Sequence, residues 1–286
     1  MANYAYYPGC SLHATARDFD LSTKAVAQKL NMRLIDIPDW NCCGASSAHN
    51  RGHFLAAAIP GRNLFLAQKV AGDIVVPCAA CYQRLQTARH ELQHSEKARE
   101  KMEEIMGYSY DPTIKVKNII EAVSENIEKG QLVRNLAGLK VVCYYGCLLV
   151  KPPGITGYGH PENPMSMDNI LASIGAQVLP YPYKTECCGG SLPFYQEGVH
   201  EKLIYDILRI AWDAGAEAIV TACPLCMSNL DMRQKESKKY GDLPDIPVFY
   251  LTELVGLALG CKSNELGLEK HFIDPLPLLQ RYNLLA

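Results

Sequence analysis

The sequence has little charge and no excess of either sign. Charged residues make up 20% of its 286 positions, and the formal net charge is −2. Proteins that bind nucleic acid or an anionic membrane surface usually carry a strongly basic patch. This balance therefore predicts no nucleic-acid partner.

Long hydrophobic runs and a leader-like start are also absent. No stretch of about 18 apolar residues occurs, which predicts no direct membrane span. The opening MANYAYYPGC lacks the basic and then apolar pattern of a secretory signal peptide. Both absences predict a cytoplasmic protein. In that compartment cysteines more often bind metals or act in catalysis than form structural disulfides.

Cysteine, by contrast, is abundant, with twelve residues in the sequence. Four of them form two adjacent pairs, Cys42–Cys43 in WNCCGAS and Cys187–Cys188 in ECCGGS. A disulfide within a pair would be strained, because bonded cysteines usually have Cα atoms at least about 4.4 Å apart. Sequence neighbours are only about 3.8 Å apart. The pairs therefore need another explanation.

The two pairs belong to a repeat that spans the chain. The segment AYYPGC matches CYYGC, WNCCGAS matches TECCGGS, and DIVVPCAAC matches AIVTACPLC. The step of 35 positions from Cys43 to Cys78 recurs from Cys188 to Cys223. A repeat this long indicates two duplicated domains rather than a solenoid, and we place them at residues 1–135 and 136–286. The second half has a longer first spacer, which we assign to the loop GITGYGHPENP at residues 154–164.

The alternation of strand-like and helix-like segments predicts an α/β fold with parallel sheets. We expect two pseudo-twofold-related Rossmann-like units, each carrying one cysteine site. Every cysteine motif follows an expected strand, and ligands bind beyond the carboxyl ends of such strands. The motifs of each half should therefore converge, with both CxxC motifs opening helices. The expected strands are Asn3–Tyr7, Arg33–Ile37, Asp73–Pro77, Leu139–Tyr145, Ala176–Tyr181, Ala216–Ala222 and Pro247–Tyr250, and the expected helices include Leu21–Leu30, Ala56–Ala71, Asp168–Ile174, Glu201–Ala214 and Leu251–Leu259.

Five cysteines of each half recur in the repeat, and we expect them to bind metal. Structural zinc uses four ligands, which would leave one recurring cysteine unused in each half. Iron–sulfur clusters also suit soft thiolates. A fifth thiol is then either a spare or a ligand of a larger, non-standard cluster, in which adjacent cysteines reach neighbouring irons. Cys143 and Cys261 lie outside the repeat, and we expect them to be small buried residues. The predicted ligands are Cys10, Cys42, Cys43, Cys78 and Cys81 in the first half and Cys147, Cys187, Cys188, Cys223 and Cys226 in the second.

These motifs resemble the CCG-domain proteins, and most closely the B subunit of heterodisulfide reductase. The resemblance covers nearly the whole chain, including both cysteine sets, YYGCLLVKPP, HPENPMSMDNI and the tail LTELVGLALG. It implies an oxidoreductase component in which each half is a CCG domain with one non-cubane [4Fe–4S] cluster, proximal in the first half and distal in the second. The five cysteines of each half then hold its cluster.

The resemblance also implies a reaction and partners. A small-molecule disulfide lies between the clusters and is reduced, or formed, by two one-electron steps; in methanogens it is the mixed disulfide of coenzymes M and B. Electrons arrive from a flavoprotein through a ferredoxin-like iron–sulfur subunit. CCG domains also occur in respiratory enzymes, so an electron-relay or quinone-reducing subunit is the alternative.

Cationic side chains near the motifs are candidates for holding anionic groups of such a substrate. Lys184 and His160 rank first, because both lie in second-half loops beside the cysteine motifs. His49 and His53 are four positions apart and share one face if residues Ala45–Leu55 are helical. We expect these two histidines to line the cleft or to meet solvent.

Overall fold

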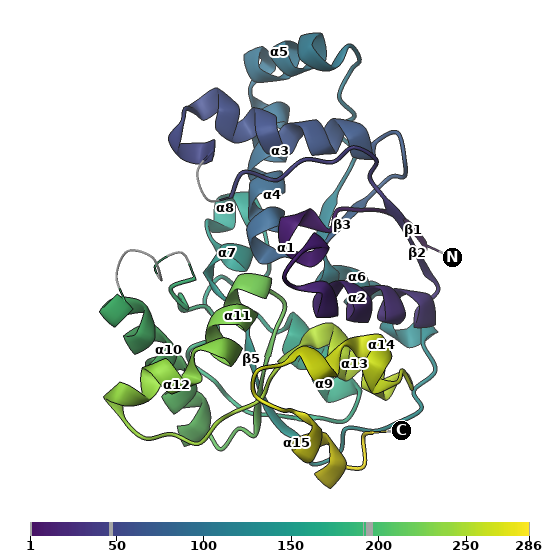
Figure 1. Cartoon of the computed structure of the whole chain (residues 1–286). Coiled ribbons are helices and arrows are strands. Elements are labelled where there is room, and N and C mark those ends of the chain that lie inside the picture. The colour runs from purple at the N-terminus through teal and green to yellow at the C-terminus, as the bar shows by residue number, and fades with distance from the viewer. Residues whose placement is uncertain (1, 46–47, 191, 193–196, 286) are drawn as a thin grey trace.

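The structure is a computed structural model that describes residues 2–45, 48–190, 192 and 197–285, and all of their side chains except those of residues 49, 129 and 197. It contains two four-stranded, fully parallel sheets with the strand orders β2-β1-β3-β4 and β6-β5-β7-β8 (Figure 1). The strands are β1 (Ala2–Tyr6), β2 (Met32–Asp36), β3 (Ile74–Val76), β4 (Val116–Asn118), β5 (Lys140–Tyr144), β6 (Gln177–Val178), β7 (Ala218–Thr221) and β8 (Val248–Tyr250).

Helices connect and cover these strands in both halves. The first half has α1 (Gly9–His13), α2 (Arg17–Lys29), η1 (Ala48–Asn50), α3 (His53–Ala67), α4 (Ala79–His94), α5 (Glu96–Met106), α6 (Ile119–Asn126) and η2 (Ile127–Lys129). The second half has α7 (Cys147–Val150), α8 (Pro153–Thr156), α9 (Ser166–Ser173), α10 (Glu197–Asp213), α11 (Pro224–Met232), α12 (Gln234–Ser237), η3 (Lys238–Tyr240), α13 (Leu251–Ala258), α14 (Ser263–Leu266), η4 (Leu268–Lys270) and α15 (Leu276–Arg281).

Short apolar strands joined by helical crossovers explain this architecture. Strand β3, with the sequence IVV, and its counterpart β7, with AIVT, are buried along their whole length. Such continuous apolar runs are typical of central parallel strands that are covered on both faces. Parallel neighbours also need long crossovers, which α2, α3 and α4 supply in the first half. The predicted α/β class with two Rossmann-like units is confirmed.

Most expected elements occur close to their predicted positions, with two differences that matter. Strand β4 was not predicted, because its short sequence VKN follows Lys115, contains Lys117 and buries only Val116 and Asn118. Residues Ala45–Leu55 do not form the single helix considered for His49 and His53. Instead, η1 ends at Asn50 and α3 begins at His53. The proposed domain boundary at residues 135/136 falls between η2 and β5.

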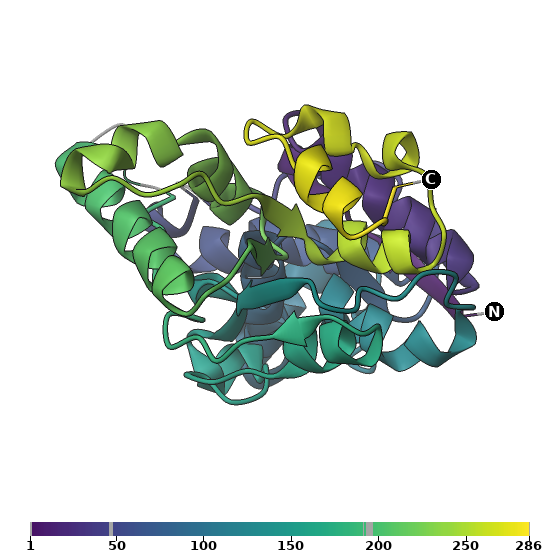
Figure 2. The same ribbon diagram turned by 90° about the horizontal axis from the view of Figure 1, so that it is seen from below.

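The two halves pack against each other through helices from opposite ends of the chain. Helix α2 of the first half contacts α13 and α14 of the second, and α4 contacts α7 and α8. Figure 2 shows the purple N-terminal helix beside the yellow C-terminal elements. Within this interface the rings of Phe19 and Tyr250 stack at a centroid distance of 4.0 Å, and the hydroxyls of Ser22 and Thr252 are 2.7 Å apart. In the part of the chain that the structure describes, no helix is both long and apolar enough to cross a bilayer.

Candidate metal centre

The recurring cysteines follow the carboxyl ends of strands in both halves, as predicted. Cys10 lies in α1 just after β1, and Cys147 begins α7 just after β5. Cys78 and Cys223 are the N-cap residues of α4 and α11, so each CxxC motif opens a helix. Backbone N–H groups at these helix starts donate hydrogen bonds to the two thiols. Helix N-termini stabilise negative charge, so these N–H groups lower the pKa of both thiols. At Cys78 the neighbouring Cys223 thiol outweighs this effect and raises the pKa, whereas the pKa of Cys223 is lowered.

Thiols from separate motifs come into contact within each half. The Sγ atoms of Cys43 and Cys81 are 3.4 Å apart, and those of the equivalent Cys188 and Cys226 are 3.7 Å apart. Each contact joins a CC pair to a CxxC motif, although the two motifs are well separated in sequence. The local fold therefore assembles the same thiol arrangement twice.

In the second half, a cavity of about 140 Å³ contains all five predicted ligands in its lining. Its other described lining residues supply no carboxylate or imidazole group. The walls thus offer soft sulfur donors on an otherwise mainly apolar surface, a donor set that favours thiophilic metals over hard cations. The lining residues are Ala79, Tyr145, Gly146, Cys147, Leu148, Cys187, Cys188, Gly190, Cys223, Leu225 and Cys226.

The two cysteine sites are adjacent in space. The Cys78 thiol of the first half and the Cys223 thiol of the second lie close enough to act on each other: Cys223 raises the pKa of Cys78, and Cys226 and then Cys78 lower the pKa of Cys223. These residues occupy equivalent positions in the repeat, and equivalent residues meet one another where a twofold axis passes between them. Ala79, which follows Cys78, also reaches the second-half cavity. The sites thus share a boundary at the start of α4 and α11.

Crowding spreads the pKa values of the thiols widely. A hydrogen bond from Cys81 lowers the pKa of Cys43 to about 7, and a hydrogen bond from Cys147 lowers the pKa of Cys187 to about 6. Hydrogen bonding to these neighbours, together with burial, raises the pKa values of the donors Cys81 and Cys147. Each half therefore loses a first thiol proton readily. Loss of further protons is opposed, because each new thiolate would be repelled by the thiolate that is already present. Bound metal cations would supply the positive charge that five adjacent thiolates require.

Two tyrosines that were not predicted to take part in the sites support them in the same way. Tyr7 donates a hydrogen bond of 2.8 Å to the carbonyl of Asn41, and Tyr144 donates one of 2.6 Å to the carbonyl of Glu186. Each acceptor immediately precedes a CC pair. Burial, followed by the charges of the surrounding cysteines, raises the pKa of both phenols. The signal was present in the sequence, since each tyrosine stands three positions before the first recurring cysteine of its half.

Gly146 makes a close approach to the second site that a side chain would obstruct. Its φ is +70°, and a Cβ atom there would lie 3.0 Å from the Sγ of Cys226. We expect Gly146→Ala to lose iron from the second half, because the methyl group displaces a ligand sulfur. The left-handed backbone would add strain of about 1–2 kcal/mol. Iron per chain and the thermal unfolding midpoint measure the two effects.

Gly157→Ala is the matched control for this variant. Gly157 has a similar φ of +59°, but a Cβ atom there would meet nothing within 4 Å. Both variants should lose stability, and only Gly146→Ala should lose iron. Equal iron contents in the two variants would show that the close approach to Cys226 is irrelevant to the metal.

Lys184 lies buried behind the second site. Its ammonium is 2.7 Å from Asp168 Oδ1, 3.0 Å from the Pro164 carbonyl and 3.1 Å from Met165 Sδ. An ammonium has three N–H donors, so these partners account for all of them. The Lys184 carbonyl also accepts hydrogen bonds from the backbone of Tyr145 and Gly146. A substrate contact by Lys184, which stays a prediction, would require one of the ammonium bonds to break.

The predicted histidines lie at the surface where the structure describes them. His160 is exposed, and its Nδ1 accepts hydrogen bonds from the backbone N–H groups of Glu162 and Asn163. The side chain of His53 is 84% exposed and lies 3.8 Å from Glu91. The side chain of His49 is outside the described residues. Substrate contacts by these three residues remain predictions.

The loop at residues 154–164 contacts the first half. Helix α8, which overlaps its start, packs on α4, and the Tyr82 hydroxyl donates a hydrogen bond of 3.0 Å to the Thr156 carbonyl. The loop is therefore part of the interface between the halves.

Cys143 and Cys261, the two cysteines outside the repeat, are free and buried.

Comparison with known proteins identifies the relatives of this chain. The CCG cysteine-rich domain matches residues 4–86 and 141–231. The chain is 33% identical to the 8-methylmenaquinol:fumarate reductase membrane anchor subunit of Wolinella succinogenes, with 96% of this chain and 98% of that protein covered. It is 30% identical to the B subunit of the ferredoxin/F420H2-dependent CoB-CoM heterodisulfide reductase of Methanosarcina acetivorans, with 98% and 97% covered.

A solved structure supports the fold. A hypothetical protein from Helicobacter pylori superposes with a TM-score of 0.76 over 94% of this chain, at 15% sequence identity. The chain spans about half of that protein, of which 51% is covered. At this identity the likeness concerns the fold alone.

The domain matches, the relatives and the geometry agree. Each matched segment contains one complete set of five cysteines, and the second set lines one cavity. The clustered thiols and the reductase relatives indicate an iron–sulfur redox subunit. The chain belongs to the CCG cysteine-rich domain family and resembles the B subunit of heterodisulfide reductase, as its motifs predicted.

Proposed function

We propose that the chain is the iron–sulfur subunit of a multi-subunit reductase in which two non-cubane [4Fe–4S] clusters act together on a substrate disulfide. The observation that carries this proposal is the contact between Cys78 and Cys223, which makes the two five-cysteine sites neighbours. Cleavage of a disulfide takes two electrons, and neighbouring one-electron centres can deliver them together.

In this proposal the ten recurring cysteines hold the clusters, and the surrounding residues shape the sites. The N-termini of α4 and α11 direct backbone N–H groups at Cys78 and Cys223. Leu148 and Leu225 form apolar parts of the second cavity, which reduces water access. Cys10, Cys42 and Cys187 are exposed, so each site keeps an edge that a small molecule can approach.

When bound, the clusters would supply one-electron transfer, and the protein would supply position and electrostatics. The relatives are named as subunits of reductases, which supports partner subunits for this chain. By resemblance, the proposed partners are a flavoprotein and a ferredoxin-like iron–sulfur subunit. The proposed contacts for anionic groups of the disulfide are Lys184, His160, His53 and His49.

The second candidate function is an electron relay or quinone-reducing subunit of a respiratory complex. The relative from Wolinella succinogenes, named as part of an 8-methylmenaquinol:fumarate reductase, favours it. In this function one cluster would exchange electrons with a partner, and the other would conduct them.

Turnover by the anaerobically purified, cluster-replete complex distinguishes the two functions. Reduced viologen supplies electrons, and the acceptor is either the coenzyme M–coenzyme B mixed disulfide, with other small disulfides tested beside it, or a menaquinone analogue. We expect reduction of a disulfide. Turnover of the quinone alone would support the second candidate. Turnover of neither acceptor would contradict both functions.

A further inference from the structure

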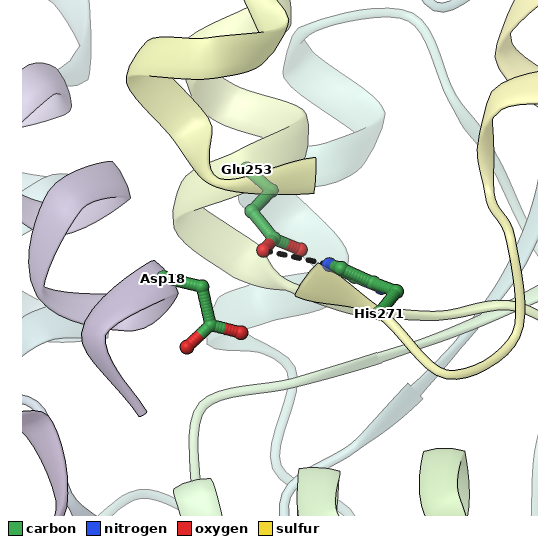
Figure 3. A group of neighbouring side chains, drawn as sticks. All are labelled: Asp18, Glu253 and His271. Atoms are coloured by element: carbon green, nitrogen blue, oxygen red, sulfur yellow. Dashed lines mark hydrogen bonds and ion pairs between the residues drawn. The ribbon is translucent and has the colours of Figure 1, made fainter. Parts of the chain in front are cut away.

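Three ionisable side chains meet at the interface between the halves, apart from the cysteine ligands. Asp18 comes from α2, Glu253 from α13, and His271 follows η4 (Figure 3). His271 Nε2 and Glu253 Oε1 are 2.9 Å apart. One oxygen or nitrogen atom from each of the three side chains lies within 4.8 Å of the others. We call these residues the interface triad.

The interface triad is buried, so its charge is poorly solvated. The side chains of Glu253 and His271 are fully buried, and Asp18 is 8% exposed. Two ionised carboxylates this close in a low-dielectric interior disfavour each other. Burial raises the pKa values of both Asp18 and Glu253. The triad therefore tends to keep protons that exposed carboxylates would release.

His271 adds an imidazole whose proton affinity is also high. Burial opposes its charged form, but the carboxylates of Glu253, Asp231 and Asp18 outweigh that effect and raise its pKa to about 9. Its Nδ1 atom is buried and has no hydrogen-bond partner among the described residues. The triad thus contains one buried ring nitrogen that no hydrogen bond from a described residue satisfies.

The charged groups around the triad are few and identifiable. Asp231 of α11 accepts hydrogen bonds from the backbone N–H groups of Phe272 and Ile273, which fixes the segment after His271 to α11. Lys270 lowers the pKa of Asp18, although burial is the larger influence on that group. Because α11 also carries Cys226, the segment that bears His271 is attached to a helix of the second cysteine site.

Tyr250 connects the triad to the boundary between the cysteine sites. Its backbone N–H donates a hydrogen bond of 2.8 Å to Glu253. Burial raises the pKa of its phenol most, and the charges of Asp18, Glu253, Cys223 and Cys78 raise it further. The same phenol is therefore within electrostatic reach of two triad carboxylates and of the two thiols that meet between the halves.

We propose that the interface triad takes up a proton from solvent each time the cysteine-bound centres gain an electron, and releases that proton when they are reoxidised. The proposal rests on the proposed function, because it requires reducible centres at the cysteines. The electron comes from the reductant or the partner subunit, and the proton comes from bulk water. One negative charge and one positive charge enter together, so the buried interface gains no net charge.

The proposal fixes the sign of a pH dependence. Reduction adds negative charge, which raises proton affinity in the triad and draws a proton in. A higher pH makes that proton harder to obtain, so the midpoint potential falls as pH rises. For one proton per electron the slope approaches about 59 mV per pH unit, the equivalent of a tenfold change. Because the pKa of His271 is raised to about 9, this imidazole already holds its proton at lower pH. The dependence between the usual carboxyl range and about pH 9 should therefore come from Asp18 and Glu253.

Potentiometric titration of the holoprotein tests this, with the reduced centres followed by electron paramagnetic resonance between pH 5 and 10. A pH-indicator dye measures proton uptake on reduction in weakly buffered solution. The test variants are Glu253→Gln, which keeps an oxygen for the Tyr250 N–H, and Asp18→Asn, which keeps the size of the side chain. We expect both variants to reduce the slope and the proton uptake to less than half of their original values.

Glu121→Gln is the matched control. Glu121 occupies the corresponding position at the start of α6, where it accepts a hydrogen bond of 2.7 Å from the Asn118 N–H. It should leave the slope unchanged. An unchanged slope in both test variants, or an equal loss in Glu121→Gln, would overturn the proposal. A stoichiometric non-iron divalent metal that is lost in Glu253→Gln would also overturn it, by showing that the triad binds a cation. A protein with no reducible centre would overturn the proposed function and this inference together.

Discussion

Cys43→Ala and Cys188→Ala are each expected to remove about half of the iron and acid-labile sulfide from the anaerobically purified protein. The two residues are equivalent members of the CC pairs, and each contacts a CxxC thiol of its own half. If both halves carry a four-iron cluster, loss of one ligand set leaves the other intact. The remaining spectrum should be that of the unaltered half, so the two variants should give different spectra that together account for the original.

Cys143→Ala and Cys261→Ala are the controls for this experiment. Both thiols are buried and free but lie outside the repeat, so their removal should leave iron content and spectrum unchanged. Full iron content after Cys43→Ala would show that the fifth cysteine of the set is a spare. Stoichiometric zinc without iron in the unaltered protein would contradict the iron–sulfur assignment for both halves.

Loss of either site is expected to lower turnover of the disulfide by at least about 100-fold, which corresponds to about 2.7 kcal/mol of transition-state stabilisation. Cys81→Ala removes a ligand from the first site, and Cys226→Ala removes its equivalent from the second. If each cluster delivers one of the two electrons, the surviving cluster cannot complete the reaction. The measurement is viologen-dependent disulfide reduction by the assembled complex.

Folding must be followed in the same variants. Each half has its own sheet and buried strands, so the unaltered half should keep its amide-exchange protection. Activity that survives the loss of one particular site would contradict joint action of the two clusters. That result would favour the relay function, with the remaining site serving the substrate.

Much of the site could be predicted from the sequence, because the same cysteine motifs and spacing occur in both halves. The equal step from Cys43 to Cys78 and from Cys188 to Cys223 located both sets of recurring cysteines, and the position of each motif after a strand explained why they converge. Helices α4 and α11 begin at the CxxC motifs, as expected. Such local patterns need no knowledge of how the halves pack.

Features that depend on long-range packing could not be predicted. Asp18, Glu253 and His271 come from distant parts of the chain, and although Glu253 corresponds to Glu121 in the first half, nothing in the repeat indicates that the three side chains meet. Lys184 stands near a cysteine motif in sequence. Its ammonium nevertheless pairs with Asp168 within a buried hydrogen-bond network. Nearness along the chain indicates proximity to a site, but it does not indicate which way a side chain points.

The contact between Cys78 and Cys223 has a consequence for the assembly of the protein. Two separate copies of one unit, paired through the same surface, would bring the equivalent cysteines together in the same way, but only at concentrations that favour dimerisation. Joining the units in one chain replaces that requirement with a fixed effective concentration. It also allows the sequence of each copy to change independently. Arg84 of the first half lowers the pKa of Cys43. The equivalent residue of the second half is Asn229, which donates a hydrogen bond to the Cys188 carbonyl. A symmetric dimer could not hold two such different environments, whereas a tandem chain can adjust each electron carrier separately.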